Sequence, residues 1–300
     1  MIRRYFIKPF RNWFKNKIEI LIKEIDSKDK ENRDLPFTVF YPNSKNSLSY
    51  IIPKEKENLI MCEQGLPVPP EKLWIEYGSN IQGYLYSGKM QIEIMIKLLE
   101  KSGLEFVKCK RILELGCSSG RMIRWLKPFA DKMEIWGTDI SSEHIYWANN
   151  YLNPPLNFAT TTTIPHLPFE DNYFDVIYAG SVFTHIDDLF DSWFLELKRI
   201  LTDNGRVYVT IHDRYSIELI ENRPEWKESL LADLLKNNNT FKNNRENFGK
   251  FVGLRGPDSQ VFYDREFFEK SIKNKFEIIS YTPEAYGYQT GVVLKKRNQN

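Results

Sequence analysis

The sequence of 300 residues lacks several features that would place a protein quickly in a class. No apolar run approaches the roughly 18 residues that a membrane-spanning helix needs, so we expect no transmembrane segment. Only three cysteines occur, Cys62, Cys109 and Cys117, an odd number without CxxC spacing. Such a set argues against a disulfide framework and against a zinc site. We therefore expect no bound metal and a reducing compartment, the cytoplasm.

The sequence also lacks a strong excess of charge of one sign. The net charge is +2, which is too close to neutral to favour a nucleic-acid-binding protein. Basic residues do concentrate in residues 1–17, but no uninterrupted apolar stretch or cleavage site follows, so we do not expect a secretion signal. Apolar residues recur at helical spacing over 10–25 and predict a basic amphipathic helix. This helix could make peripheral contact with the inner membrane surface through residues 1–25, or pack on its own domain or a partner.

The chain divides into three parts by composition. Residues 1–35 combine the expected helix with a charged linker, and 36–103 form an N-terminal extension that is rich in proline up to residue 75. From residue 104, short apolar runs alternate with helical stretches, which predicts an α/β fold with a parallel, doubly wound sheet. We expect strands at 111–116, 134–139, 156–162, 174–179 and 206–211, helices at 120–130, 142–152 and 188–201, and a turn at Asn204–Gly205.

The last third of the chain breaks this alternation. Residues 214–260 are polar and rich in asparagine, so we expect an insertion in the domain that spans 104–300. A helix is expected at 264–274. The strands at 276–281 and 291–295 have little chain between them, which favours an antiparallel hairpin because a parallel pair needs a crossover.

The most informative segment is 114–120, ELGCSSG, at the turn from the first expected strand of the sheet to the next helix. Glycines at such a turn allow tight backbone geometry and close approach of a ligand. Ligands of open α/β sheets bind at the carboxyl ends of the strands. Asp139 ends the next strand, where an acid can bind the two hydroxyls of a ribose. The segment therefore predicts a nucleoside site.

A nicotinamide cofactor fits this segment poorly. The dinucleotide fingerprint requires Gly-x-Gly-x-x-Gly. Counted from Gly116, the second and third glycine positions hold Ser118 and Arg121. Glu114 would also repel a pyrophosphate, whereas it could attract an amine or a sulfonium.

The segment instead resembles the class I S-adenosylmethionine (SAM)-dependent methyltransferases, whose motif is acid-x-Gly-x-Gly-x-Gly. Glu114, Gly116 and Gly120 match this motif, and Ser118 stands at its middle glycine. Further similarities follow in order at Asp139, 167–177 (LPFEDNYFDVI), 181–186 (SVFTHI), 196–205 (ELKRILTDNG) and the terminal hairpin. The resemblance covers 104–213 and, more loosely, 264–296. It implies a Rossmann-like class I methyltransferase fold with SAM as the cofactor.

The resemblance also implies roles for single residues. Glu114 would contact the amine of the methionine part of SAM, and Asp139 its ribose. The other expected cofactor-binding positions are Gly116, Ser118 and Gly120 in the loop, Ile140 beside the adenine, Thr161 at the adenine edge and Tyr84 in a lid over the sulfonium. Each has a structural alternative, such as a helix cap for Asp139 or a core ring for Tyr84.

Two histidines are candidates for the catalytic base. His185 and His212 follow the fourth and fifth expected strands, at the mouth of the site. Histidine titrates near working pH, so either could accept a proton as the methyl group is transferred. The alternative is a structural histidine bonded to the backbone. A base of this kind favours methylation of a hydroxyl on a small molecule or a glycan.

Two other functions stay open at this point. Ser118 in the loop would fit a catalytically silent, methyltransferase-like binding or scaffold protein. A nucleic-acid methyltransferase would need a basic groove at the site, whereas the positive charge lies in 1–17. The Asn/Asp-Pro-Pro-aromatic motif of amino-group methylation is also replaced by Ala179-Gly-Ser-Val. We therefore expect an enzyme with a small-molecule or glycan acceptor and no nucleic-acid partner.

Overall fold

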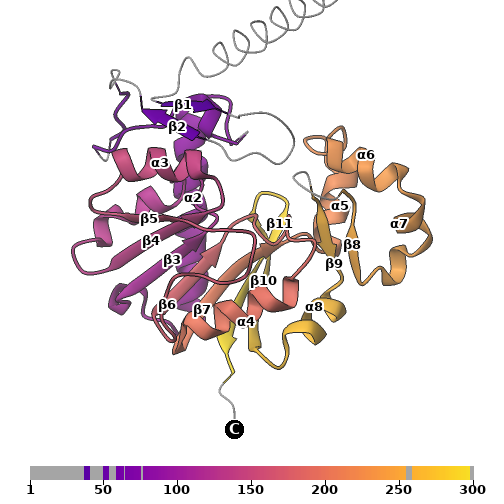
Figure 1. The fold of residues 1–300 in the computed structure, drawn as a ribbon. Helices are drawn as coiled ribbons and strands as arrows, with labels where there is room; N and C mark the ends of the chain where they lie inside the picture. The colour runs from indigo at the N-terminus through magenta and orange to yellow at the C-terminus, as the bar shows by residue number, and fades with distance from the viewer. Residues whose placement is uncertain are drawn as a thin grey trace, which may run out of the picture.

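The computed structural model describes residues 37–40, 50–53, 59–63, 65–75, 77–254 and 259–297 (Figure 1). The helix expected at 10–25 and the charged linker lie outside these residues. Within the described ranges, no helix is both long enough and apolar enough to cross a membrane. No group of histidine, cysteine and acidic side chains in the same ranges is arranged to hold a metal ion.

A mixed seven-stranded sheet lies at the centre, in the order β10-β11-β7-β6-β3-β4-β5. Its strands are β3 Arg111–Leu115, β4 Glu134–Asp139, β5 Asn157–Thr160, β6 Phe174–Ala179, β7 Leu201–Ile211, β10 Phe276–Tyr286 and β11 Gln289–Lys296. Strands β3 to β7 are parallel, and β11 runs antiparallel to β7 and β10. The predicted doubly wound sheet with an antiparallel terminal hairpin is confirmed.

Helices cover both faces of the sheet because the central strands are apolar on both faces. In β3, Ile112 packs into one hydrophobic core and Leu113 into the other. The first core includes α2 Ile81–Lys101 and α3 Ser142–Tyr151, and the second includes α4 Phe190–Ile200 and α8 Arg265–Ile272. The helix α2 belongs to the predicted N-terminal extension, yet its Ile92 and Met95 share the core of the sheet.

The other described elements of the N-terminal part are short. They are the antiparallel pair β1 Phe37–Phe40 and β2 Tyr50–Pro53, and the 3-10 helices η1 Glu71–Leu73 and η2 Phe106–Lys108.

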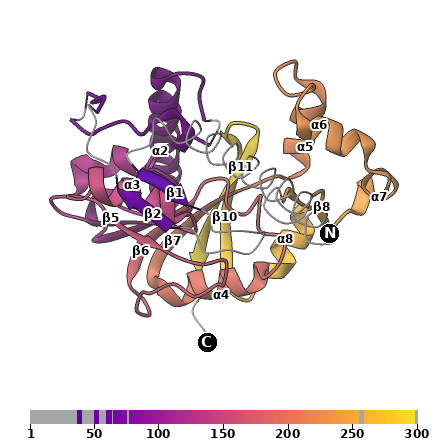
Figure 2. The ribbon, with the colours of Figure 1, turned by 45° about the horizontal axis from the view of Figure 1, so that its top comes forward.

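The predicted insertion folds around a small core of its own, which contains Ile220, Leu235, Phe241 and Phe262. Its elements are α5 Arg214–Asn222, α6 Leu230–Asn237, α7 Asn239–Asn243, η4 Arg245–Asn247 and β8 Lys250–Val252, which pairs antiparallel with β9 Val261–Tyr263. In both views the turn of the β10–β11 hairpin lies between this insertion and α2 (Figures 1 and 2).

One local prediction holds only in part, and another is wrong. The helix expected at 120–130 is a series of turns followed by the 3-10 helix η3 Ile123–Phe129. Pro128 lies inside it, where the missing N–H and the ring of proline oppose an α-helix. Asn204 and Gly205, expected as a turn before the strand, lie within β7, where the pairing with β6 shifts register between Leu201 and Arg206.

Candidate active site

The loop after β3 has a backbone that requires glycine. Gly116 and Gly120 have φ angles of +76° and +81°, a region that costs other residues about 1–2 kcal/mol. A Cβ on Gly116 would lie 2.4 Å from Cγ2 of Val182, and one on Gly120 would lie 2.5 Å from Cδ1 of Leu152. Ser118 adopts a positive φ of 49°, so it follows the loop although it is not glycine.

Asp139, at the end of β4, holds this loop through backbone hydrogen bonds. The N–H of Ser118 donates to its Oδ2 at 2.8 Å, and the N–H of Ser141 donates to its Oδ1 at 2.8 Å. A carboxylate offers about four lone-pair sites, so two hydrogen bonds leave room for others. The side chain is partly exposed, which makes this remaining capacity accessible from solvent.

Two more predicted residues lie at the same edge. Ile140 follows Asp139 directly, and its side chain is 61% exposed, which is unusual for isoleucine. The N–H of Thr161 donates to the carbonyl of Asp139 at 2.8 Å. The ends of β4 and β5 thus bring together an exposed apolar side chain, a carboxylate and a threonine.

Glu114 lies on β3 just before the loop and is buried, with 3% of its surface exposed. The hydroxyl of Tyr178 on β6 donates to its Oε2 at 2.9 Å. Burial raises the pKa of Glu114 to about 8, against the lowering effects of this hydrogen bond and of Arg121. Because burial penalises the charged carboxylate, a cation placed beside it would restore that form.

No local sequence pattern singles out Arg121, whose guanidinium the structure places against two aromatic rings. Its guanidinium carbon lies 3.9 Å from the ring centroid of Tyr77 and 5.6 Å from that of Tyr286. The side chain is buried and donates to the hydroxyls of Ser87, at 3.2 Å, and Tyr286. These partners lie as far as 165 positions away in the chain, so no local pattern signals the contact.

Tyr84 was expected in a lid over the cofactor, and the structure buries it completely in α2. Its ring stacks on Trp74 at 5.0 Å between centroids, and its hydroxyl lies 3.2 Å from Oγ of Ser119 in the glycine loop. Ser119 in turn donates to the carbonyl of Leu73 at 2.6 Å. Tyr84 therefore supports the loop from the N-terminal side, and its predicted contact with a sulfonium stays a prediction.

His185 follows β6 and is exposed to solvent. Its Nδ1 lies 2.7 Å from the carbonyl oxygen of Ser259, at the start of the segment that leads into β9. A carbonyl can only accept, so Nδ1 carries the proton and donates it. In the neutral ring Nε2 then has a free lone pair, which is the form of a proton acceptor.

His212 directly follows β7, and here the structure separates two histidines for which the sequence predicted equivalent positions. Its side chain is 1% exposed, and its ring lies 4.8 Å from the ring of Phe262 and 5.4 Å from that of Tyr288. Burial and the neighbouring His185 lower the pKa of His212 to about 3. The imidazole is thus neutral near pH 7, and its low pKa makes it a weak base.

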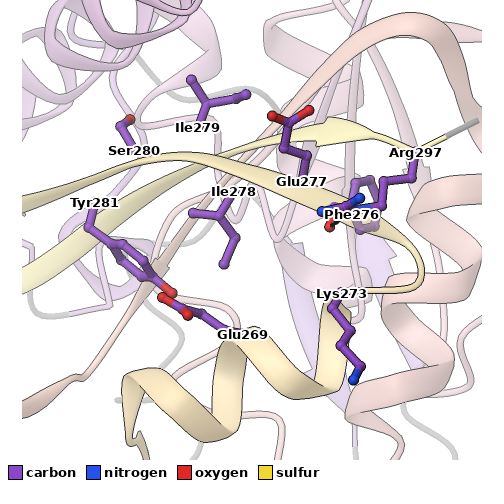
Figure 3. A pocket seen from close by; sticks show the side chains of 9 residues that line it. All are labelled: Glu269, Lys273, Phe276, Glu277, Ile278, Ile279, Ser280, Tyr281 and Arg297. Carbon is purple, nitrogen blue, oxygen red and sulfur yellow. Dashed lines mark hydrogen bonds between the residues drawn. The ribbon is translucent and has the colours of Figure 1, made fainter.

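A hollow of about 460 Å³ lies elsewhere, between α8 and the edge strand β10 (Figure 3). It is lined by residues such as Glu269 of α8, Lys273 directly after α8, and Ile278 and Tyr281 of β10. The strands β11, β7 and β6 lie between β10 and β3 in the sheet. The hollow is therefore at the sheet edge, away from Glu114 and Asp139, and it is not part of the candidate site.

Comparison with known proteins agrees with this arrangement. Residues 113–209 match the sequence profile of a methyltransferase domain family. Residues 113–209 therefore belong to a methyltransferase domain. The matched range starts in β3 and ends in β7, so it includes the glycine loop, Asp139 and His185 but not His212.

The similarity to solved structures covers more of the chain than residues 113–209. The crystal structure of the PH0226 protein from Pyrococcus horikoshii has a TM-score of 0.51 and 20% identity, and the match covers 74% of this chain and 95% of that chain. A SAM-dependent methyltransferase from Clostridium acetobutylicum has a TM-score of 0.49 and 15% identity, with 70% and 92% covered. At the sequence level, none of the curated proteins compared matches the chain. The similarity to the PH0226 protein shows that the shared fold extends beyond residues 113–209.

Proposed function

We propose that this methyltransferase transfers the methyl group of SAM to a hydroxyl of a small molecule or glycan, with His185 as the base. The observation that carries the proposal is the hydrogen bond between Nδ1 of His185 and the carbonyl of Ser259, 2.7 Å long. It orients the ring and leaves Nε2 free, on an exposed side chain at the carboxyl end of β6. His212 is buried and lacks this exposure.

The cofactor residues are part of the same proposal, and their chemistry fits SAM. Asp139 has lone pairs left for the ribose hydroxyls, and the exposed Ile140 offers an apolar surface for the adenine. Thr161 lies at the same edge. Glu114 is a buried carboxyl that a cation would stabilise in its charged form, as the ammonium of the methionine part would.

The glycine loop completes this cofactor site. Gly116, Ser118 and Gly120 all have positive φ angles, so their backbone is shaped independently of a ligand. The hydroxyl of Tyr84 on α2 contacts Ser119 in the loop, which limits the movement of the loop. A site held in advance in this way loses less entropy when the cofactor binds.

The chemistry follows from the side chains that meet at this edge. When bound, SAM supplies a methyl group on a positively charged sulfur, which is already electrophilic. The protein has to align the acceptor oxygen with that methyl carbon, and such alignment lowers the barrier by several kcal/mol. As the acceptor oxygen bonded to the methyl carbon, the methyl–sulfur bond would break and the electron pair would stay on the neutral sulfur of the demethylated cofactor. Nε2 of His185 would accept the hydroxyl proton and then release it to solvent, to which the ring is exposed.

The variant His185→Gln tests the proposed base. We expect the rate of methyl transfer to fall by about 10²- to 10⁴-fold, because proton transfer by a positioned side chain contributes about that much. SAM affinity, measured by calorimetric titration, should stay the same. His166→Gln is the matched control, since His166 lies in an exposed loop after β5.

The measurement is transfer of labelled methyl from SAM to a panel of sugars and small hydroxyl compounds. A full rate in His185→Gln would contradict the role of His185. Binding of SAM without transfer to any acceptor would contradict the proposal and favour a catalytically silent binding protein.

A further inference from the structure

Several polar atoms beside His185 are buried without a hydrogen-bond partner in the described part of the chain. They are both ring nitrogens of His212, the hydroxyl of Ser259 and the side-chain carbonyl of Gln260. The residues are neighbours, because His212 pairs in parallel with Phe262 in the segment 259–263. Buried polar groups are normally satisfied, so a concentration of unsatisfied ones indicates a place for a ligand or a water that it holds.

Aromatic rings adjoin this group from two other parts of the fold. Tyr288, in the turn of the β10–β11 hairpin, packs against His212. Trp226, which follows α5, lies 4.6 Å from Tyr288 between ring centroids, with the planes at 71°. Both rings are only half-buried, so they offer apolar surface to solvent.

Each arginine described between residues 214 and 265 is already paired with a carboxylate. The pairs are Arg214 with Asp264, Arg223 with Glu284, Arg245 with Glu221 and Arg265 with Asp213. His212 is neutral near pH 7 as well. None of these described groups is left to neutralise a phosphate or a carboxylate of a ligand.

We propose that His212, Trp226, Ser259, Gln260 and Tyr288 form an acceptor subsite for a neutral sugar ring. This inference rests on the proposed function and narrows its acceptor class. A sugar ring has apolar C–H faces, which suit Trp226 and Tyr288, and several hydroxyls.

Those hydroxyls suit the unpartnered polar groups. A neutral imidazole has one donor and one acceptor, a serine hydroxyl can be either, and an amide carbonyl only accepts. A single hydroxyl, as on a phenol, could not satisfy His212, Ser259 and Gln260 together. A polyhydroxylated ring can, directly or through a water held between them.

Ligand-observed saturation-transfer NMR on the full chain saturated with SAM tests this proposal. The probes are methyl hexosides as neutral sugars, glucuronic acid as a charged ring of the same size, and phenol as a ring with one hydroxyl. We expect transfer to at least one methyl hexoside and little to the other two. Stronger transfer to glucuronic acid or phenol, or no transfer to any probe, would overturn the proposal.

Two variants connect the binding to the named residues. His212→Phe keeps a ring between Phe262 and Tyr288 but removes both unpartnered nitrogens. We expect it to raise Tm, because the buried nitrogens no longer lack partners, and to weaken hexoside binding by about tenfold or more. A purely structural His212 would give the first effect without the second, and that result would also overturn the proposal.

The second variant is Trp226→Ala, with Trp125→Ala as its matched control. Trp125 is also half-buried but lies in η3, against the first core of the sheet. Only Trp226→Ala should weaken hexoside binding, again by about tenfold. SAM affinity measured on the same samples separates the outcomes: intact SAM binding without hexoside binding refutes the subsite alone, whereas hexoside binding without methyl transfer refutes the proposed function alone.

Discussion

Two neighbouring regions at the carboxyl edge of the sheet, the cofactor side and the acceptor side, hold their side chains in different ways. On the cofactor side, Asp139 accepts hydrogen bonds from the N–H groups of Ser118 and Ser141. Ser118 belongs to the glycine loop, and Ser141 lies two positions after Asp139 in the chain. On the acceptor side, His185 is held by a carbonyl 74 positions away, in the insertion. A strand-and-loop motif therefore specifies the first region, whereas tertiary packing of an inserted segment specifies the second.

Burial also acts in opposite directions on the two regions. It raises the pKa of Glu114 to about 8 and lowers that of His212 to about 3. Both groups are mainly neutral at pH 7, but they differ in what they can do next. Glu114 can become charged when a cation arrives, while His212 stays neutral over the working range of pH.

The largest effect on the cofactor side should come from Gly116→Ala. The added Cβ meets Val182 at 2.4 Å in a loop whose φ is +76°, so the loop must leave its conformation. Strain and overpacking together cost about 2–5 kcal/mol, which corresponds to a loss of SAM affinity of about 30-fold or more in calorimetry.

The matched control for this variant is Gly103→Ala. Gly103 has a similar φ of +82° but no atom within 4 Å of the added Cβ. Its SAM affinity should stay at the wild-type value. Equal losses of SAM affinity in both variants would show that backbone strain at either glycine is enough to reduce binding. That result would argue against a specific role of the glycine loop in binding SAM.

Asp139→Asn should give the next largest effect, and only on the cofactor side. The amide keeps one oxygen for a backbone N–H but loses the charge-assisted bonds proposed for the ribose. We expect SAM affinity to fall by about 10- to 100-fold, or about 1.5–3 kcal/mol. At saturating SAM, hexoside binding should be unaffected, and a loss there would mean that Asp139 also contributes to the acceptor side.

The pH dependence of stability should separate the two regions with opposite slopes. The raised pKa of Glu114 means that the native protein binds more protons than the unfolded chain between about pH 4.5 and 8, so this group lowers stability as pH rises through that window. The lowered pKa of His212 means that the unfolded chain binds more protons between about pH 3 and 6.5, so this group lowers stability as pH falls.

Chemical denaturation from pH 4 to 9 measures both slopes. Glu114→Gln should remove the loss of stability with rising pH between about pH 4.5 and 8, and His212→Phe the loss with falling pH below about 6.5. In addition, SAM titrated at pH 7 in phosphate and in Tris should show release of up to about one proton, since the proposed ammonium contact favours the charged form of Glu114. Proton release that persists in Glu114→Gln would have another origin.

The smallest effect should come from Tyr84→Phe. Loss of the hydroxyl contact with Ser119 should lower the free energy of unfolding by about 0.5–1.5 kcal/mol, measured by denaturant titration. SAM affinity should fall less than in Asp139→Asn, because the aromatic packing on Trp74 remains. Tyr86→Phe serves as the control, since Tyr86 is 64% exposed and should not change stability.

The contrast between the regions also explains what the sequence could predict. Strand periodicity and the glycine loop are local patterns, so the sheet, Glu114 and Asp139 were found at the expected edge. The different burial of His185 and His212 depends on the segment 259–263 and on the hairpin turn. Neither histidine's neighbours in sequence carry that information.

Residues that sequence reasoning missed share the same reason. The hydroxyl of Tyr178 on β6 donates to Glu114 on the neighbouring strand β3. Arg121 contacts Tyr77, which precedes it in the chain, and Tyr286, near the end of the chain. The helix expected at 120–130 differs for a local reason. It is a 3-10 helix because Pro128 lies inside it and opposes the α-helical form.

The β10–β11 turn has a consequence for the kinetics of the enzyme. Tyr286, before Gly287, bonds Arg121 on the cofactor side, and Tyr288, after it, packs on His212 on the acceptor side. The two tyrosines are separated by one residue and cannot move independently by much. Binding of a ligand on one side should therefore change the affinity of the other side for its ligand. The two substrates should then bind in a preferred order rather than at random.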